Sequence, residues 1–102
     1  MKDGLIEMDT ERGKVIGFTS DKFLKGSYLW LKDGFVYISF IASKAEGNLR
    51  QLFQNITSKG YGIKVPNPFP KMEAICKHYG FQKTREYFKE AYEDIDVWIK
   101  VA

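Results

Sequence analysis

The dipeptide Asp33-Gly34 constrains the fold of this chain more than any other local feature. It stands between two runs rich in β-branched and aromatic residues, 27–32 and 35–42. A two-residue Asp-Gly link between strand-like runs favours a type I′ turn, in which both linking residues take positive φ. The sequence therefore predicts a tight β-hairpin in the first half of the chain.

The second strand of this hairpin is apolar at nearly every residue from Phe35 to Ala42. A strand with one solvated face alternates apolar and polar residues, whereas a strand buried on both faces reads as a continuous apolar run. We therefore expect a central strand that is covered on both faces, with helices packed on it.

A helix is predicted to follow this strand. Ser43-x-x-Glu46 has the spacing of a capping box, and Gly60 lies just past the last periodic residue. The apolar stripe between them has i, i+3, i+4, i+7 spacing and consists of Leu49, Leu52, Phe53 and Ile56. Residues 61–65 read as a short strand, and the order strand, helix, strand favours a parallel pair joined by a crossover.

Three prolines between residues 66 and 70 predict a stiff loop, because proline removes a backbone donor and fixes φ. Pro70 suits the first turn of a second helix, which Gly80 ends. The apolar face of that helix consists of Met72, Ile75, Cys76 and Tyr79. Residues 86–94 are too charged to assign, and residues 95–100 alternate as a final strand.

The N-terminal residues 1–13 are polar and mixed in charge, and we expect a loose arm or a short edge element there. The run from Val15 to Thr19 has the composition of a strand. At 102 residues the chain is too short for two independent cores, so residues 14–102 are expected to form one domain.

Composition narrows the functional classes. No apolar stretch is long enough to span a membrane and the N-terminus has no signal peptide, which predicts a cytoplasmic protein that does not bind membranes. A single cysteine, Cys76, and a single histidine argue against a disulfide and a metal site. The 16 Lys and Arg residues are interleaved with 13 Asp and Glu residues, so nucleic acid is not an expected partner.

Two segments resemble parts of a known family. Residues 72–81, which end in Gly80-Phe81, are similar to the helix with a "kxGF" signature that precedes the last strands of GNAT-superfamily N-acyltransferases. The turn 44–49 stands where that family carries Q/R-x-x-G-x-G/A; Lys44 and Gly47 fit this spacing, and Leu49 replaces a small residue. The resemblance covers roughly residues 35–101. It implies an α/β (α+β) fold with a GNAT-like mixed sheet, in which a β-hairpin leads into the central strand, two helices pack on the sheet and the N-terminal part is truncated.

The resemblance also implies a function, the transfer of an acetyl group from acetyl-CoA to an amine of a small molecule or protein. The expected cofactor-binding residues are Ser39, Phe40, Ile41 and Ala42 along the pantetheine arm, and Lys44, Gly47, Asn48 and Leu49 around the pyrophosphate. The family often places a catalytic tyrosine four residues before the glycine of its signature, where this chain has Cys76. Cys76 and the nearby Tyr79 are therefore the candidate catalytic residues. Three alternatives stay open for the acceptor site: it is open, it is completed by a second subunit in a homodimer or by a partner protein, or acetyl transfer has been lost.

The same patterns allow a function of a different class. Ser43, Glu46, Gly60 and Gly80 are also ordinary helix punctuation that needs no ligand. The chain is then a non-catalytic interaction module that keeps the fold without cofactor binding and docks a partner through exposed aromatic residues. Those expected to be exposed are Tyr28, Trp30 and Trp98.

Overall fold

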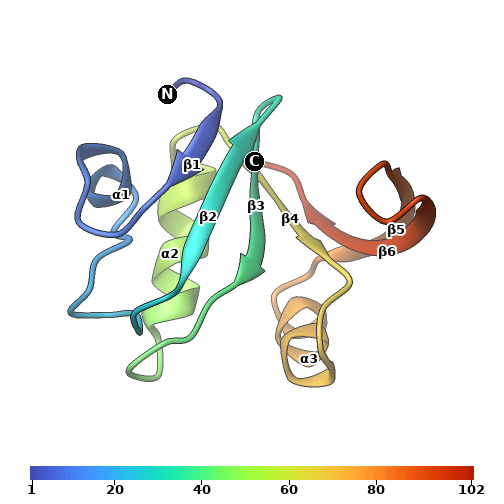
Figure 1. The fold of residues 1–102 in the computed structure, drawn as a ribbon. Helices are drawn as coiled ribbons and strands as arrows, with labels where there is room; N and C mark the ends of the chain where they lie inside the picture. Colours follow the sequence, from blue (N-terminus) through green and yellow to red (C-terminus); the bar gives the residue numbers. More distant parts are fainter.

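The computed structural model describes all 102 residues as an α+β fold with one mixed sheet and three helices (Figure 1). In chain order the elements are β1 (Gly4–Ile6), α1 (Glu11–Val15), β2 (Tyr28–Lys32), β3 (Phe35–Phe40), α2 (Asn48–Ser58), β4 (Gly62–Pro66), α3 (Pro70–His78), β5 (Gln82–Phe88) and β6 (Glu93–Lys100). The six strands lie in the order β1-β2-β3-β4-β6-β5. All neighbouring strands are antiparallel except β3 and β4, which are parallel.

The predicted hairpin is confirmed as β2 and β3. Asp33 and Gly34 both have positive φ, 52° and 83°, as a type I′ turn requires. Lys32 lies opposite Phe35 and Trp30 lies opposite Tyr37 in the register. A register shift at Tyr28 leaves Ser39 as the extra residue of a β-bulge, because Leu29 pairs with Ile38 and Tyr28 pairs with Phe40.

The predicted parallel pair is also confirmed, but it is short. Phe35, Val36 and Tyr37 pair with Gly62, Ile63 and Lys64, and no later residue of β3 pairs with β4. Figure 1 shows the two strands side by side at one end and spread apart at the other, with α2 behind β2 and α3 beyond the far end of β4. We call these three residue pairs the seam, since they alone pair the strands β1–β3 with the strands β4–β6.

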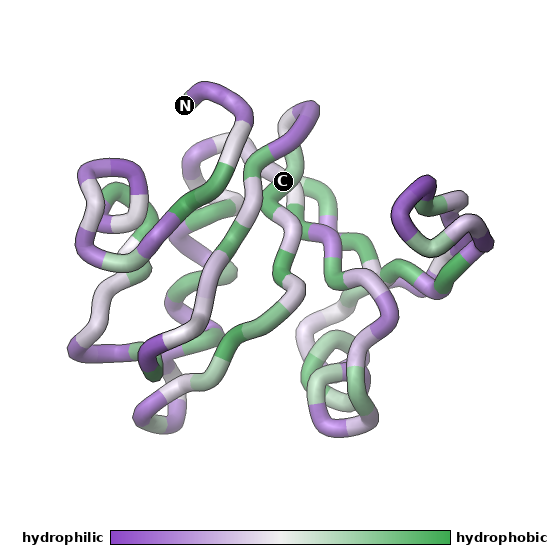
Figure 2. The backbone as a smooth tube through the Cα atoms, in the orientation of Figure 1, coloured by the Kyte–Doolittle hydropathy of each residue, from purple (hydrophilic) through white to green (hydrophobic).

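The core lies between the sheet and α2. Of the predicted stripe, Leu52, Phe53 and Ile56 are buried and Leu49 is partly buried. The Phe53 ring of α2 packs against two rings at the end of α3. Its centroid lies 5.8 Å from the centroid of the Tyr79 ring and 5.2 Å from that of the Phe81 ring. Figure 2 shows hydrophobic residues along the central strands and hydrophilic residues at the tip between β2 and β3. The contacts of Phe53 with Tyr79 and Phe81 join α2 to the end of α3.

The second predicted helix, α3, begins at Pro70, where the missing N–H of proline costs nothing. Gly80 follows it with a φ of 80°, and the N–H of Phe81 donates to the carbonyl of Cys76 at 2.9 Å. The final predicted strand is confirmed within β6, and residues 82–88, partly unassigned from the sequence, form its antiparallel partner β5.

Of two predictions near the N-terminus, one is wrong, and in the other the short edge element is the alternative that the structure contains. The strand predicted over Val15–Thr19 is wrong, because Val15 ends α1 and the chain then turns through Gly17 at a φ of 76°. Thr10 caps this helix, since its hydroxyl accepts a hydrogen bond from the N–H of Gly13 at 3.1 Å. Within residues 1–13, β1 is an ordered edge strand paired with β2.

The prediction that helices cover both faces of β3 is wrong as well. Val36 and Ile38 point to the buried face, whereas Phe35 and Tyr37 are only partly buried and Phe40 is exposed. In Figure 1 α2 lies behind β2 and β3, and no helix lies in front of them. The outer face of β3 is apolar although no helix covers it. A continuous apolar run in the sequence does not distinguish a covered face from an uncovered one.

Candidate functional site

The turn before α2 differs from the predicted capping box. The helix begins at Asn48, and its N-cap is Gly47 with a φ of 90° and no side-chain hydrogen bond to the first turn. Ser43 lies too far from the helix to cap it, and its hydroxyl instead hydrogen-bonds to the backbone of Ala45. The capping-box prediction is therefore wrong, and Glu46 lies outside the first turn.

An uncapped start leaves backbone donors free at α2. The N–H of Gln51 donates to the carbonyl of Gly47, but the N–H groups of Leu49 and Arg50 have no acceptor within the protein. The first turn has no acidic residue, and Arg50 is exposed there. Free amides and the helix dipole make this end of the helix favourable for an anion.

Two predicted cofactor residues also hold this turn in place. The ammonium group of Lys44 donates to the carbonyl of Ser20 at 2.6 Å, and the side-chain amide of Asn48 donates to the carbonyl of Lys22 at 3.0 Å. The backbone N–H of Lys44 also donates to Lys22, at 2.8 Å. The segment around Ser20–Lys22 thus fixes the turn, and Lys44 keeps its positive charge close to it.

The predicted pantetheine residues form the end of β3 and the segment that leads into this turn. Ala42 is hydrogen-bonded to the segment that precedes β2, because its N–H donates to the hydroxyl of Ser27 at 3.1 Å and its carbonyl accepts from the N–H of Leu24 at 2.8 Å. Ile41 makes no backbone hydrogen bond within the protein, and neither Ser39 nor Phe40 pairs with β4. A backbone edge without a β4 partner therefore runs from the seam to the start of α2.

The two candidate catalytic residues lie in different environments. Cys76 is fully buried in the core, and burial, assisted by the Glu73 carboxylate, raises its pKa to about 11. A thiol with this pKa stays protonated at neutral pH and behaves as a small apolar side chain. Tyr79 is only partly buried, and its ring stands edge-on to Phe53. Of the two, Tyr79 is the better placed for proton transfer.

A charged cluster on the outer face of the sheet was not predicted. The ammonium group of Lys64 lies 3.0 Å from the Glu86 carboxylate and over the rings of Phe35 and Tyr37, at 4.6 and 5.5 Å from their centroids. Burial lowers the pKa of Lys64, but Glu86 and Tyr37 outweigh this effect and raise it above its usual value. These residues meet through strand register, which local sequence patterns do not specify.

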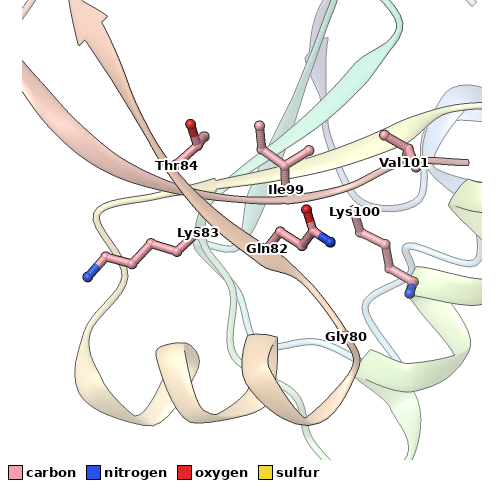
Figure 3. Close-up of a pocket in the computed structure, with 7 residues that line it drawn as sticks. All are labelled: Gly80, Gln82, Lys83, Thr84, Ile99, Lys100 and Val101. Atoms are coloured by element: carbon pink, nitrogen blue, oxygen red, sulfur yellow. The ribbon is translucent and has the colours of Figure 1, made fainter.

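The surface has two hollows, of which the first lies away from the turn before α2 and the second reaches it at Lys44. Figure 3 shows the first, of about 420 Å³, around the end of β6 and the start of β5. Its Lys100 already donates to the carbonyl of Tyr79, at 2.9 Å, and its Lys83 pairs with Asp96. The second, of about 590 Å³, lies near the start of β2 and is lined by both acidic and basic residues, including Glu7, Asp9, Lys25 and Lys44. Neither hollow gathers groups with one evident chemical task.

The aromatic residues expected to dock a partner separate into two groups. Tyr28 and Trp30 are 42% and 46% exposed, as predicted. Trp98 is only 5% exposed, so the prediction that it is exposed is wrong. It lies opposite Val65 in the sheet, and the ammonium group of Lys77 from α3 lies 5.9 Å from its ring.

No helix is long and apolar enough to cross a membrane. No group of three or more His, Cys, Asp or Glu side chains lies close enough together to hold a metal ion. Comparison of the chain with protein-family models, with curated proteins and with solved structures found no match. The proposed function therefore depends on the geometry of the turn and on the sequence resemblance.

Proposed function

We propose that the chain binds acetyl-CoA along the free edge of β3 and transfers its acetyl group to an amine, as the resemblance to GNAT N-acyltransferases implies. The observation that carries this proposal is the continuity between a free strand edge and an uncapped helix start. The edge around Ile41 leads directly to Gly47 and to the free N–H groups of Leu49 and Arg50. Such an arrangement suits a ligand with an extended amide-containing arm and a phosphate group at one end.

The charges around the turn support an anionic ligand. Lys44 is held beside the turn and Arg50 extends from the first helical turn. Leu49 stands where the family has a small residue, but its side chain is partly buried against the core and so is directed away from solvent. Glu46 precedes the helix and does not oppose the free amides from within the first turn.

In the proposed reaction the acceptor nitrogen attacks the thioester carbonyl, a C–N bond forms and the C–S bond breaks. The amine proton passes to solvent or a base, and the departing thiolate takes a proton. We assign the donation of that proton to Tyr79 rather than to Cys76. Tyr79 is the partly buried C-cap residue of α3, whereas Cys76 is enclosed in the core.

Isothermal titration of the protein with acetyl-CoA, beside CoA and ATP, tests cofactor binding. We expect micromolar affinity for acetyl-CoA and CoA, about 8 kcal/mol, that ATP does not reproduce. Arg50→Glu should weaken binding at least about 10-fold, because it places a carboxylate beside the free amides. Lys59→Glu is the matched control, with the same charge reversal at the opposite end of α2. Absence of binding at about 1 mM acetyl-CoA, or equal effects of the two variants, would refute the proposed site.

The second candidate function is a non-catalytic interaction module. It is favoured by the exposure of Tyr28 and Trp30 on a sheet face that no helix covers. Large exposed aromatic side chains on one face are typical of docking surfaces. The titration with acetyl-CoA distinguishes the two functions. An acyltransferase releases heat on binding acetyl-CoA, whereas an interaction module releases none and binds its partner whether or not acetyl-CoA is present.

A further inference from the structure

The outer face of the sheet carries a continuous line of side chains across its strands. Direct register partners share a face, and they connect Leu5 to Trp30, Trp30 to Tyr37, and Tyr37 to Lys64. Residues two apart on a strand also share a face, so Tyr28 and its partner Phe40 lie beside this line. We call Leu5, Tyr28, Trp30, Tyr37 and Phe40 the outer patch.

The outer patch is comparable in area to the largest apolar patch of a typical monomeric protein. Tyr28, Trp30 and Phe40 are each 42–50% exposed. An aromatic side chain has about 150–250 Å² of surface, so these three residues together expose about 300 Å². Patches of that size are often functional. A standard interface takes about 800 Å² from each partner, more than half of it apolar, so the outer patch is large enough to form its centre.

The charges at the two ends of the outer patch indicate the kind of partner. Lys32 lies two residues after Trp30 on β2, at one end, whereas Glu7 lies two residues after Leu5, just past the end of the antiparallel strand β1, at the other. Both side chains are exposed, and neither forms an ion pair within the chain. A phosphate backbone would require cations at both ends, whereas opposite charges at opposite ends suit a surface that pairs with itself.

We infer that the outer patch is the interface of a homodimer, in which two sheets pack face to face about a two-fold axis with β2 antiparallel to β2 of the second copy. This arrangement stacks Trp30 near the axis on the aromatic residues of the second copy. It also brings Lys32 of each copy toward Glu7 of the other. Two packed sheets lie about 10 Å apart, which is the thickness that interleaved aromatic side chains fill.

Sedimentation velocity of the full chain tests this inference. We expect a dimer at micromolar concentration. Trp30→Glu should weaken association at least about 30-fold, because a central tryptophan is a typical hot spot and the change places two carboxylates near the axis. Tyr87→Glu is the control, since Tyr87 is 60% exposed on the edge strand β5, outside the outer patch. Circular dichroism should show that both variants remain folded.

Charge reversal tests the orientation of the two copies. Lys32→Glu and Glu7→Lys should each weaken the dimer, and the double variant should restore it. Lys25 lies close to Glu7 in the same hollow, and Lys25→Ala should not reproduce the effect of Lys32→Glu. A monomer at concentrations up to about 1 mM, or a dimer that Trp30→Glu leaves intact, would overturn the inference. Neither outcome decides the acetyl-CoA titration, because the outer patch meets the proposed cofactor site only at Phe40, and the substituted residues Trp30, Lys32 and Glu7 lie outside that site.

Discussion

The seam between β3 and β4 offers a sharp test of the packing described here. A Cβ atom added to Gly62 would lie 2.4 and 2.6 Å from two ring atoms of Phe35, its register partner, and 3.1 Å from the carbonyl oxygen of Lys100. Real side chains do not tolerate the first two distances, so Gly62→Ala must displace the Phe35 ring. The ring in turn lies under the ammonium group of Lys64, at 4.6 Å.

The magnitude follows from two opposing terms. Replacing glycine with alanine at a compatible position stabilises a protein by about 0.4–1 kcal/mol through the unfolded chain. Overpacking at a well-packed site costs about 1–3 kcal/mol, and displacing the ring also weakens its contact with Lys64. We therefore expect Gly62→Ala to lower the free energy of unfolding by about 1–2 kcal/mol. In a chain of this size that corresponds to a fall of roughly 4–16 °C in Tm.

A double-mutant cycle with Phe35→Ala isolates the contact. Without the ring, Gly62→Ala should cost less than about 0.5 kcal/mol, so the two changes should differ from additivity by at least about 0.5 kcal/mol. Urea denaturation of the four proteins measures this coupling. If Gly62→Ala costs the same with and without the ring, the Phe35 contact is not what requires glycine, and the reasoning fails.

Two further predictions concern ionisable groups. Because the pKa of Cys76 is raised from 9.0 to about 11, the unfolded chain loses this proton first as pH rises. The free energy of unfolding should therefore fall between pH 9 and 11, by about 1–3 kcal/mol more in the unsubstituted protein than in Cys76→Ala. Urea denaturation at each pH measures this difference. Parallel plots of the free energy of unfolding against pH for the two proteins would contradict the buried thiol. Glu86→Gln should lower the free energy of unfolding by about 1 kcal/mol, because it removes the partner of the partly buried Lys64. Glu93→Gln removes an exposed carboxylate without an ion pair, so it should change the free energy of unfolding by less than about 0.5 kcal/mol. Equal losses in the two variants would show that the ion pair of Glu86 with Lys64 does not stabilise the protein.

The elements that the sequence predicts correctly have local causes. Asp33 and Gly34 adopt positive φ, which a two-residue hairpin turn requires. The ends of α2 and α3 are similarly marked by Gly60 and Gly80, and the start of α3 by Pro70. In each case a few neighbouring residues determine the backbone, so their pattern is sufficient without knowledge of the fold.

Other features depend on distant contacts, and prediction fails there. Ser43 and Glu46 have the spacing of a capping box, but hydrogen bonds from the turn to Ser20 and Lys22 hold it so that the helix starts later, after Gly47. The run from Val15 resembles a strand because two of its apolar residues, Ile16 and Phe18, are buried in the core from a turn rather than from a strand. Burial depends on the completed core rather than on local propensity.

The candidate site shows the same division. Because Gly47, Asn48 and Leu49 are consecutive, their grouping at a helix start was predictable, whereas the free edge beside them depends on where β3 and β4 stop pairing. The sequence also placed Cys76 and Tyr79 on one helix face, but could not show that the first is enclosed and the second only partly buried. Register and enclosure are properties of the assembled sheet.

The seam also has a consequence for how the chain reaches this structure. The hairpins β2–β3 and β5–β6 each close a short loop, so each can form from residues that are already near one another. The seam instead joins residue 35 to residue 62, and its closure requires the intervening α2 crossover to be in place. The seam is thus a non-local step, as is the pairing of β4 with β6, which joins residue 63 to residue 100, and both are expected to follow the formation of the two hairpins.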